Sequence, residues 1–140
     1  MLSVIIPTYN EIDYIEDAIK SVAFADEIIV IDSYSTDGTK EKALSLGCTI
    51  LERKFDNFSN QKNYAISSAK GDWILFLDGD ERVSQKLKLE ILSVIKNGKH
   101  SGYKISFPHF YMNRFLYHKV DRVNLIQFDH LHLWLNFPNI

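Results

Sequence analysis

Short runs of apolar residues alternate with segments of helical periodicity over the first hundred residues of the chain. The runs 3–7, 27–31, 49–51 and 73–77 predict four strands, and the last is typical of a strand whose two faces are both buried. Between and after them, apolar residues recur three and four positions apart, which predicts four amphipathic helices. Strand and helix units joined by a few residues form parallel sheets with right-handed crossovers. The pattern therefore predicts an α/β fold.

Polar residues and glycines indicate where the helices begin and end. Asn10 is the expected N-cap of the first helix, and Asn57 or Ser59 is the expected N-cap of the third. The second helix should end at Gly47, and Ser84 should cap the fourth. The side chains expected to face the sheet are Ile12, Ile15, Ile19 and Val22 in the first helix, Phe58, Ala65, Ile66 and Ala69 in the third, and Leu87, Ile91, Leu92 and Ile95 in the fourth.

The last third of the chain has a different character. Residues 102–107 alternate like a half-exposed strand, and after Pro108 no helical periodicity or cap is present. We therefore divide the chain into an α/β region, 1–107, and a tail, 108–140, that is rich in aromatic residues and histidine. One interpretation of the tail is that its aromatic residues cover the sheet or form a contact in a homo-oligomer.

Composition restricts the classes of function. The chain has 140 residues, 46% of them hydrophobic, and its net charge of −2 offers no general attraction for nucleic acid. The single Cys48 is expected to be a small buried residue in a reducing compartment. The sequence lacks a signal peptide pattern and any apolar run long enough to span a membrane. We expect a cytoplasmic protein, with peripheral contact at the inner face of the cytoplasmic membrane as a further option.

Polar residues follow three of the predicted strands. The segments are 7–11 after the first, Asp32 and Ser33 after the second, and 78–81 after the fourth. Ligands of open α/β sheets bind just beyond the carboxyl ends of the strands, so these side chains should meet in one crevice. Asp32 is suited to accept hydrogen bonds from a base or a ribose.

The end of the fourth strand indicates a metal rather than a phosphate loop. The sequence contains neither of the glycine-rich phosphate-binding motifs, G-x-G-x-x-G and G-x-x-x-x-G-K-[ST]. Asp78 and Asp80, separated by Gly79, can instead hold Mg²⁺ or Mn²⁺, which would neutralise a diphosphate. Glu81 either joins them or acts as a charge at the entry of the next helix.

Four motifs in order resemble the family-2 glycosyltransferases of the GT-A fold. They are S-V-I-I-P-T-Y-N-E at 3–11, D-S-Y-S-T-D-G-T at 32–39, Q-K-N-Y-A at 61–65, and the segment ending L-D-G-D-E at 77–81. The second and third look closest to bacterial lipopolysaccharide-core sugar transferases. The resemblance covers about residues 3–107. It implies a Rossmann-like parallel sheet flanked by helices, here truncated after the donor-binding half.

The resemblance implies an inverting transfer of a sugar from a nucleotide diphosphate, usually uridine diphosphate, to a polysaccharide or glycolipid. Lys62 would face the diphosphate, Asp78 would face the ribose or reach the metal through water, and Asp80 would bind the metal. Many relatives have a second acid where this chain has Ser33. The residues that would line the base and ribose site are Pro7, Tyr9, Asn10, Glu11, Asp32 and Ser33.

The resemblance also requires a general base for the acceptor hydroxyl, which the sequence does not identify. The carboxylates after Glu90 are Asp121 and Asp129, and both are weak candidates that a surface loop would also explain. The tail would be the start of the acceptor region. Similar transferases continue for about a hundred residues more, which puts the completeness of the catalytic site in question.

Two alternatives remain open from the sequence. A phosphotransferase of the haloacid dehalogenase type also has D-x-D after a buried strand, but it expects threonine or valine two residues later, where this chain has Arg82. A non-catalytic or truncated domain that binds a nucleotide-sugar without turnover is the second alternative.

Overall fold

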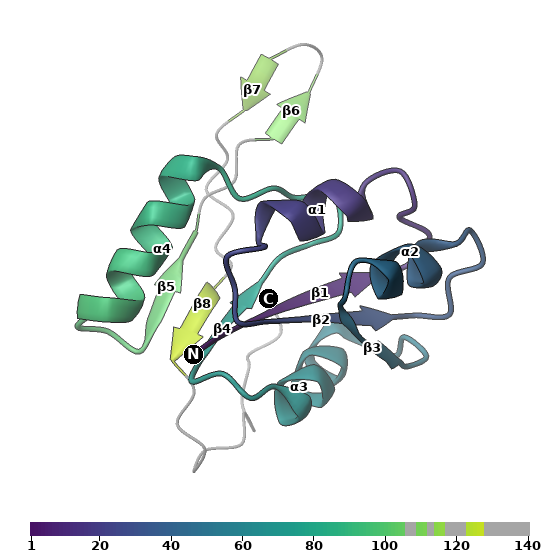
Figure 1. Cartoon of the computed structure of the whole chain (residues 1–140), viewed down its shortest axis with the longest axis horizontal. Helices are drawn as coiled ribbons and strands as arrows, with labels where there is room; N and C mark the ends of the chain where they lie inside the picture. Colours follow the sequence, from purple (N-terminus) through teal and green to yellow (C-terminus); the bar gives the residue numbers. More distant parts are fainter. Residues whose placement is uncertain (106–108, 112–113, 117–122, 128–140) are drawn as a thin grey trace.

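The computed structural model describes residues 1–105, 109–111, 114–116 and 123–127. They form a six-stranded sheet in the order β3-β2-β1-β4-β8-β5 and a separate hairpin of β6 and β7 (Figure 1). The strands are β1 (Leu2–Thr8), β2 (Glu27–Asp32), β3 (Thr49–Glu52), β4 (Trp73–Phe76), β5 (Gly102–Lys104), β6 (His109–Tyr111), β7 (Arg114–Leu116) and β8 (Val123–Gln127). The helices are α1 (Ile15–Ser21), α2 (Thr39–Ser45), α3 (Phe58–Ser68) and α4 (Gln85–Asn97).

The first four strands are parallel, as the sequence predicts. β1 lies between β2 and β4 and pairs with both, with Ile5 opposite Ile29 on one side and Phe76 on the other. β8 is antiparallel to β4 and to β5, so this half of the sheet is mixed. β8 comes from the tail, in which no strand is evident from the sequence pattern, and it lies inside the sheet.

Helices cover both faces of the sheet, which explains the continuous apolar strands. Val4 and Ile6 of β1 pack on the face covered by α1, α2 and α4, whereas Ile5 packs on the face covered by α3 (Figure 1). Every residue of β4 is buried, as the run 73–77 predicts. Cys48 is buried on the face covered by α1, α2 and α4. Desolvation raises the pKa of its thiol to about 11, which fits a packing role.

The helix ends follow the predictions in part. Asn57 and Ser84 cap α3 and α4 by accepting from the backbone N–H of Asn60 and Leu87. The N-cap prediction for Asn10 is wrong, because α1 begins four residues later, after Tyr14. Each described helix is too short or too polar to cross a membrane.

Three side chains expected to face the sheet do not: Ile12 precedes α1 and lies outside both hydrophobic clusters, and Phe58 and Leu92 are exposed. Phe58 is the first residue of α3 and is 67% exposed. Its ring packs edge-on against the ring of Phe55, which is itself exposed, with 5.0 Å between the ring centres. Leu92 is 39% exposed, and the inner face of α4 consists of Leu87, Ile91, Val94 and Ile95 instead. The buried face of α4 is therefore narrower than the number of apolar residues in the helix suggests.

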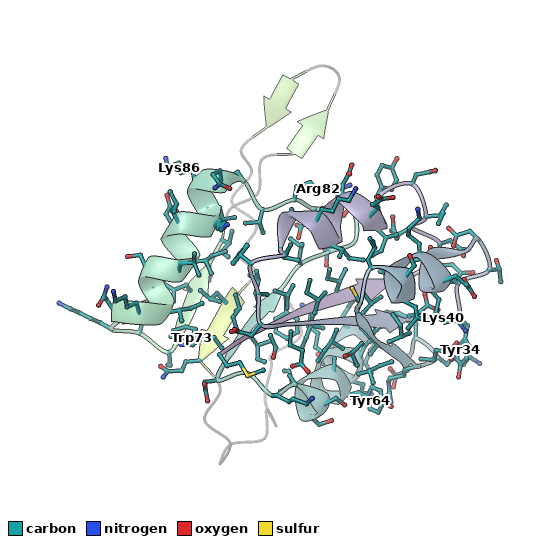
Figure 2. All side chains as sticks on the ribbon, viewed as in Figure 1. Tyr34, Lys40, Tyr64, Trp73, Arg82 and Lys86 are labelled. Carbon is teal, nitrogen blue, oxygen red and sulfur yellow. The ribbon has the colours of Figure 1, made fainter. Side chains whose placement is uncertain are left out.

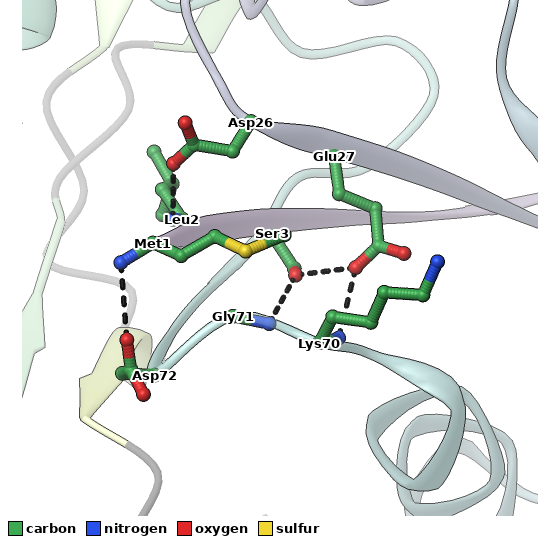
Figure 3. Close-up of polar contacts among 8 residues, drawn as sticks. All are labelled: Met1, Leu2, Ser3, Asp26, Glu27, Lys70, Gly71 and Asp72. Carbon is green, nitrogen blue, oxygen red and sulfur yellow. Dashed lines mark hydrogen bonds and ion pairs between the residues drawn. The ribbon is translucent and has the colours of Figure 1, made fainter.

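A polar clamp holds together the amino ends of β1, β2 and β4 (Figure 3). The Ser3 hydroxyl donates to Glu27 at 2.6 Å and accepts from the Gly71 N–H at 2.9 Å, while the Lys70 N–H donates to the same Glu27 oxygen at 2.9 Å. A Cβ on Gly71 would lie 2.6 Å from the Ser3 nitrogen and 2.9 Å from the Met1 carbonyl oxygen. Only glycine fits this point, because these neighbours are backbone atoms.

We expect Gly71→Ala to lower the free energy of unfolding by about 2–3 kcal/mol, since the backbone must shift and the clamp loses hydrogen bonds. Urea unfolding measures this loss. Gly47→Ala is the control: its Cβ would meet nothing within 4 Å, although its φ of +83° is strained for alanine. An equal or larger loss in Gly47→Ala would contradict the steric explanation.

Candidate functional site

The sheet opens between β1 and β4 at the carboxyl ends of these strands. The strand order reverses here, because β2 and β3 lie on one side of β1 and β4 lies on the other. The Leu77 N–H still donates to the Ile5 carbonyl at 3.1 Å. Pro7, two residues further along β1, has no N–H with which to continue the ladder. β1 then continues beside β2 alone, and the loops that follow β1 and β4 begin at this point, where ligands of open α/β sheets bind.

The loops after β1 and β2 are joined by reciprocal hydrogen bonds. The Asn10 N–H donates to the Ser35 hydroxyl at 2.9 Å, and the Thr36 N–H donates to the Asn10 side-chain oxygen at 2.9 Å. Asn10 adopts a left-handed conformation, with φ of 54°, which asparagine tolerates better than most residues. Its side chain thus holds the neighbouring loop rather than capping α1.

A second set of bonds continues this junction toward α2. The Glu11 N–H donates to the Thr39 hydroxyl at 2.8 Å, which in turn donates to Asp37 at 2.5 Å. Asp37 also accepts from the Ile12 N–H at 3.1 Å. Desolvation raises the pKa of Asp37, but the hydrogen bonds from Thr39 and the Ile12 N–H outweigh it and lower the pKa overall. Asp37 is therefore ionised and fixes both loops.

Asp32 and Ser33 lie beneath these loops. Asp32 is fully buried and accepts from the Thr8 hydroxyl at 3.3 Å and from the Ser35 hydroxyl and N–H at 2.6 and 2.8 Å. Ser33 accepts from the buried Gln61 side chain at 2.9 Å, which ties β2 to α3. In this structure Asp32 supports the loop, and a ligand would reach its carboxylate only after Ser35 moves.

The loop after β4 folds against the loop after β1. A Cβ on Gly79 would lie 3.2 Å from Cγ of Glu11 and 3.5 Å from Cγ2 of Thr8, so the glycine allows this close approach. The Asp78 N–H donates to the Glu81 carboxylate at 2.9 Å, and the Glu81 N–H donates to the Asp78 carbonyl at 2.9 Å. Glu81 closes this turn and is not at the start of α4, which begins at Gln85.

Arg82 fixes the outer side of the same loop. Its guanidinium donates to the carbonyls of Glu81 at 2.8 Å and Gly79 at 3.4 Å, and lies 3.8 Å from Asp17 of α1. The Val83 N–H donates to the hydroxyl of Ser21, also on α1. Figure 2 shows Arg82 beside α1, where it joins the loop to this helix.

Glu11 lies at the centre of a group of carboxylates from all three loops. Burial raises its pKa first, and the negative charges of Asp80, Asp37 and Asp78 raise it further. Hard oxygen ligands of this kind suit Mg²⁺ or Mn²⁺. Among the described residues, no three histidine, cysteine or acidic side chains are arranged to hold one ion. The residues fit a cation that takes one or two carboxylates and completes its coordination with substrate phosphates.

Lys62 extends from α3 to the end of β4. Its ammonium lies 4.9 Å from the centre of the Phe76 ring, and the side chain is half-buried. A lysine that only solvated the helix surface would not lie over the last residue of this strand. Its charge is therefore on the side of the sheet where the carboxyl ends of the strands lie.

Most of the predicted site residues lie at the carboxyl edge of the first, second and fourth strands. Tyr9 is 62% exposed, and Asp80 is exposed while Asp78 is half-buried. Asp121 and Asp129 lie outside the described residues. The residues that the sequence analysis does not assign to the site are Ser35, Thr36, Asp37, Thr39 and Gln61. The run of short polar side chains at 35–39 is the signal that would have indicated a hydrogen-bonded loop.

Solved structures resemble this arrangement. Glucosyl-3-phosphoglycerate synthase of Mycobacterium tuberculosis in complex with uridine diphosphate aligns over 73% of this chain and 42% of its own, with a TM-score of 0.62 and 25% identity. A further complex of that enzyme contains Mn²⁺, uridine diphosphate and glucosyl-3-phosphoglycerate. The mannosyltransferase of Pyrobaculum calidifontis, in complex with GDP-mannose and Mn²⁺, aligns over 72% of this chain with a TM-score of 0.63, and its 23% identity shows the fold alone.

Relatives in sequence include glycosyltransferases. An uncharacterized glycosyltransferase of Rickettsia bellii is 45% identical over 91 residues, which are 64% of this chain and 31% of the relative. The poly(ribitol-phosphate) beta-N-acetylglucosaminyltransferase of Staphylococcus aureus is 32% identical over 96 residues, or 60% of this chain and 17% of the relative. The chain thus spans about a third or less of the length of these relatives.

The family comparison covers almost the whole chain. Residues 3–139 match the family model described as glycosyl transferase family 2. The match includes all four sequence motifs and the strands whose carboxyl ends carry the predicted site residues. The parallel sheet flanked by helices agrees with the GT-A fold of the solved glycosyltransferases. The chain belongs to glycosyl transferase family 2.

Proposed function

We propose that the chain binds the donor in an inverting transferase that moves a sugar from a nucleotide diphosphate, uridine diphosphate in particular, to a glycan or glycolipid. The observation that carries the proposal is the meeting of Glu11, Asp78 and Asp80 at the point where the strand order reverses. Dense negative charge at this point of an α/β sheet is suited to bind a phosphate-bearing ligand only through a cation. Membership of the family supports the transferase and argues against the phosphotransferase.

The loops after β1 and β2 would receive the nucleoside. Tyr9 is exposed beside Asn10, and the hydrogen bonds of Asn10 to the second loop hold both in one arrangement before a ligand arrives. Pro7 and Ser33 lie at the ends of the same strands, and Asp32 remains the acid beneath the pocket. Preorganised loops lower the ordering cost of binding.

The diphosphate would lie between Lys62 and the acidic group. Asp80, assisted by Asp78, would hold a divalent cation, which when bound stabilises the negative charge on the departing nucleotide diphosphate. Lys62 would place a second positive charge near the phosphates. The ionised Glu11 keeps the cation in this corner by its charge. The complexes of the mycobacterial enzyme with uridine diphosphate and Mn²⁺ support this assignment.

The remaining steps concern the acceptor. An inverting transfer requires a base on the face of the sugar opposite the leaving group, and Asp121 and Asp129 stay weak candidates for it. We propose residues 1–107 as the donor-binding region and 108–140 as the start of the acceptor region or a contact between copies. The D-S-Y-S-T-D-G-T and Q-K-N-Y-A motifs support an acceptor of the lipopolysaccharide-core type, reached in the cytoplasm.

The donor site is tested by calorimetry with uridine diphosphate and Mn²⁺. We expect Asp80→Asn to weaken Mn²⁺-dependent nucleotide binding at least about tenfold, because the amide loses the charge that attracts the cation. Asp13→Asn is the matched control, since Asp13 is an exposed acid of the β1–α1 loop outside the group around Glu11. Failure of the wild-type protein to bind uridine diphosphate with Mn²⁺ would refute the donor site.

Turnover distinguishes the remaining alternatives. Donor hydrolysis or transfer that Asp80→Asn abolishes would support the transferase. Binding without any turnover would support a non-catalytic domain. Hydrolysis of a phosphate ester, lost in Asp78→Asn, would support the phosphotransferase.

The raised pKa of Glu11 predicts a pH-dependent stability effect. The folded state disfavours the ionised Glu11 side chain, so this side chain lowers the free energy of unfolding at neutral pH. The loss disappears as the pH falls through the raised pKa and below 4.5, where Glu11 is protonated in both the folded and the unfolded state. Without divalent cations, Glu11→Gln should raise Tm by roughly 1–3 °C at pH 7, with a smaller gain at pH 4. Mn²⁺ should stabilise the wild type more than the variant. Thermal unfolding that shows a constant difference across this pH range would rule out the electrostatic cause.

Substitution of Lys62 tests the second positive charge. Lys62→Met should weaken binding of uridine diphosphate about 5–30-fold and affect uridine much less, because uridine lacks the phosphates. Lys70→Met, an exposed lysine beyond the end of α3, is the control and should leave both affinities unchanged. A loss of the same size for uridine would mean that Lys62 acts through the structure of the pocket.

A further inference from the structure

The outer face of α4 differs in charge from the rest of the molecule. Residues 83–105 contain five lysines and one acid, Glu90, for a net charge of +4 with histidine neutral. The whole chain carries −2, so the remaining residues carry −6. The positive charge is concentrated in α4 and the segment that follows it, directly after the loop that contains Asp78 and Asp80.

Leucines lie on the solvent side of this helix among the lysines. Leu89 is 62% exposed and Leu92 is 39% exposed. Lys86 precedes Leu89 by three residues, and Lys96 follows Leu92 by four, so the four side chains share one face. Leu87, Ile91, Val94 and Ile95 occupy the opposite face and pack on the core. α4 is therefore apolar on its inner face and both basic and apolar on its outer face.

In contrast to three lysines of α1 and α2, the lysines of this face are not neutralised by acidic side chains. Lys20 and Lys42 pair with Glu16, and Lys40 pairs with Glu52, at 2.7–3.0 Å. In the described part of the chain, Lys86, Lys96 and Lys99 form no ion pair, and Glu90 is the one acid on α4. Lys88 differs, because its ammonium lies over the Phe24 ring at 5.4 Å. The outer face of α4 thus keeps its positive charge for an external partner.

We propose that the outer face of α4, defined by Lys86, Leu89, Leu92 and Lys96, docks on the surface of an anionic lipid bilayer. Uncompensated lysines are attracted to anionic headgroups, and leucines between them enter the boundary between headgroups and acyl chains. A nucleic acid would satisfy the lysines and leave the leucines in water. Docking would hold the chain at a membrane, where a glycolipid acceptor lies. Docking itself does not depend on the proposed activity.

Co-sedimentation with vesicles tests the proposal. The complete 140-residue chain should bind vesicles of phosphatidylcholine with about 40% phosphatidylglycerol at low salt and should not bind phosphatidylcholine alone. Lys86→Glu/Lys96→Glu should lower the partition coefficient at least about tenfold, because each lysine near an anionic surface contributes roughly fivefold. Leu89→Ser/Leu92→Ser should lower it as well, since the serines do not insert.

Matched controls separate this face from general effects. Lys54→Glu/Lys70→Glu changes the net charge equally at exposed positions outside α4 and should keep most of the binding. Leu44→Ser removes a leucine that is 61% exposed on α2 and should bind as the wild type does. The substituted side chains are all partly or fully exposed, and unchanged thermal unfolding checks that each variant folds.

Four results would overturn the proposal. They are absence of binding to anionic vesicles, equal binding to neutral vesicles, equal losses in the Lys54/Lys70 control, and full binding by Leu89→Ser/Leu92→Ser. The last result would indicate a general site for polyanions. A dimer in solution that dissociates in the leucine variant would show instead that a second copy covers this face. Vesicle binding is measured without nucleotide, so its failure and the failure of the donor site remain distinct.

Discussion

The arrangement of the site depends on the hydrogen bonds of one strand. β1 is paired on both sides along most of its length, and then Pro7 removes the donor that would continue its ladder with β4. Beyond that point β1 and β2 stay together as far as Thr8 and Asp32, while the chain after β4 leaves the sheet and its loop packs against Thr8 and Glu11. The loops of the site begin where this pairing ends, because backbone groups that no longer pair within the sheet must find partners in loops.

Those partners are supplied by side chains, and they make the loops specific. Asn10, Ser35, Asp37 and Thr39 accept backbone N–H groups across two loops that follow different strands. The same packing brings Glu11 within the field of Asp78 and Asp80, which costs free energy as long as no cation is present. The network holds these carboxylates close together, so this edge of the sheet is strongly negative.

The charge distribution extends this arrangement to the surface. The acidic group is concentrated in the loops, whereas the lysines are concentrated after the β4–α4 connection. Arg82 and Ser21 bind that connection to α1, so it is a fixed link between the acidic group around Glu11 and the basic helix. A small net charge therefore conceals two regions of opposite sign, each suited to a different partner.

The sequence by itself determined the parallel core and the strand ends at which most of the predicted site residues lie. Continuous apolar runs identify the buried strands, and Asn57 and Ser84 mark the starts of α3 and α4 as their N-caps. The polar strand ends lie near one another because parallel strands share a carboxyl edge. It could not assign Asn10, whose partner Thr36 is 26 residues away, since an N-cap and a bridge between loops use the same side chain. It also gave no sign that Val123–Gln127 enters the sheet between β4 and β5.

Tertiary structure decided which polar residues meet and which apolar residues stay outside. Periodicity places Leu92 near the inner face of α4, but the width of the surface beneath the helix sets where burial ends. Likewise, Asp32 is acidic in the sequence, while its burial under Ser35 arises from the fold of its own loop. Local pattern encodes elements because it acts along the chain, and contacts between distant residues depend on the three-dimensional packing of those elements.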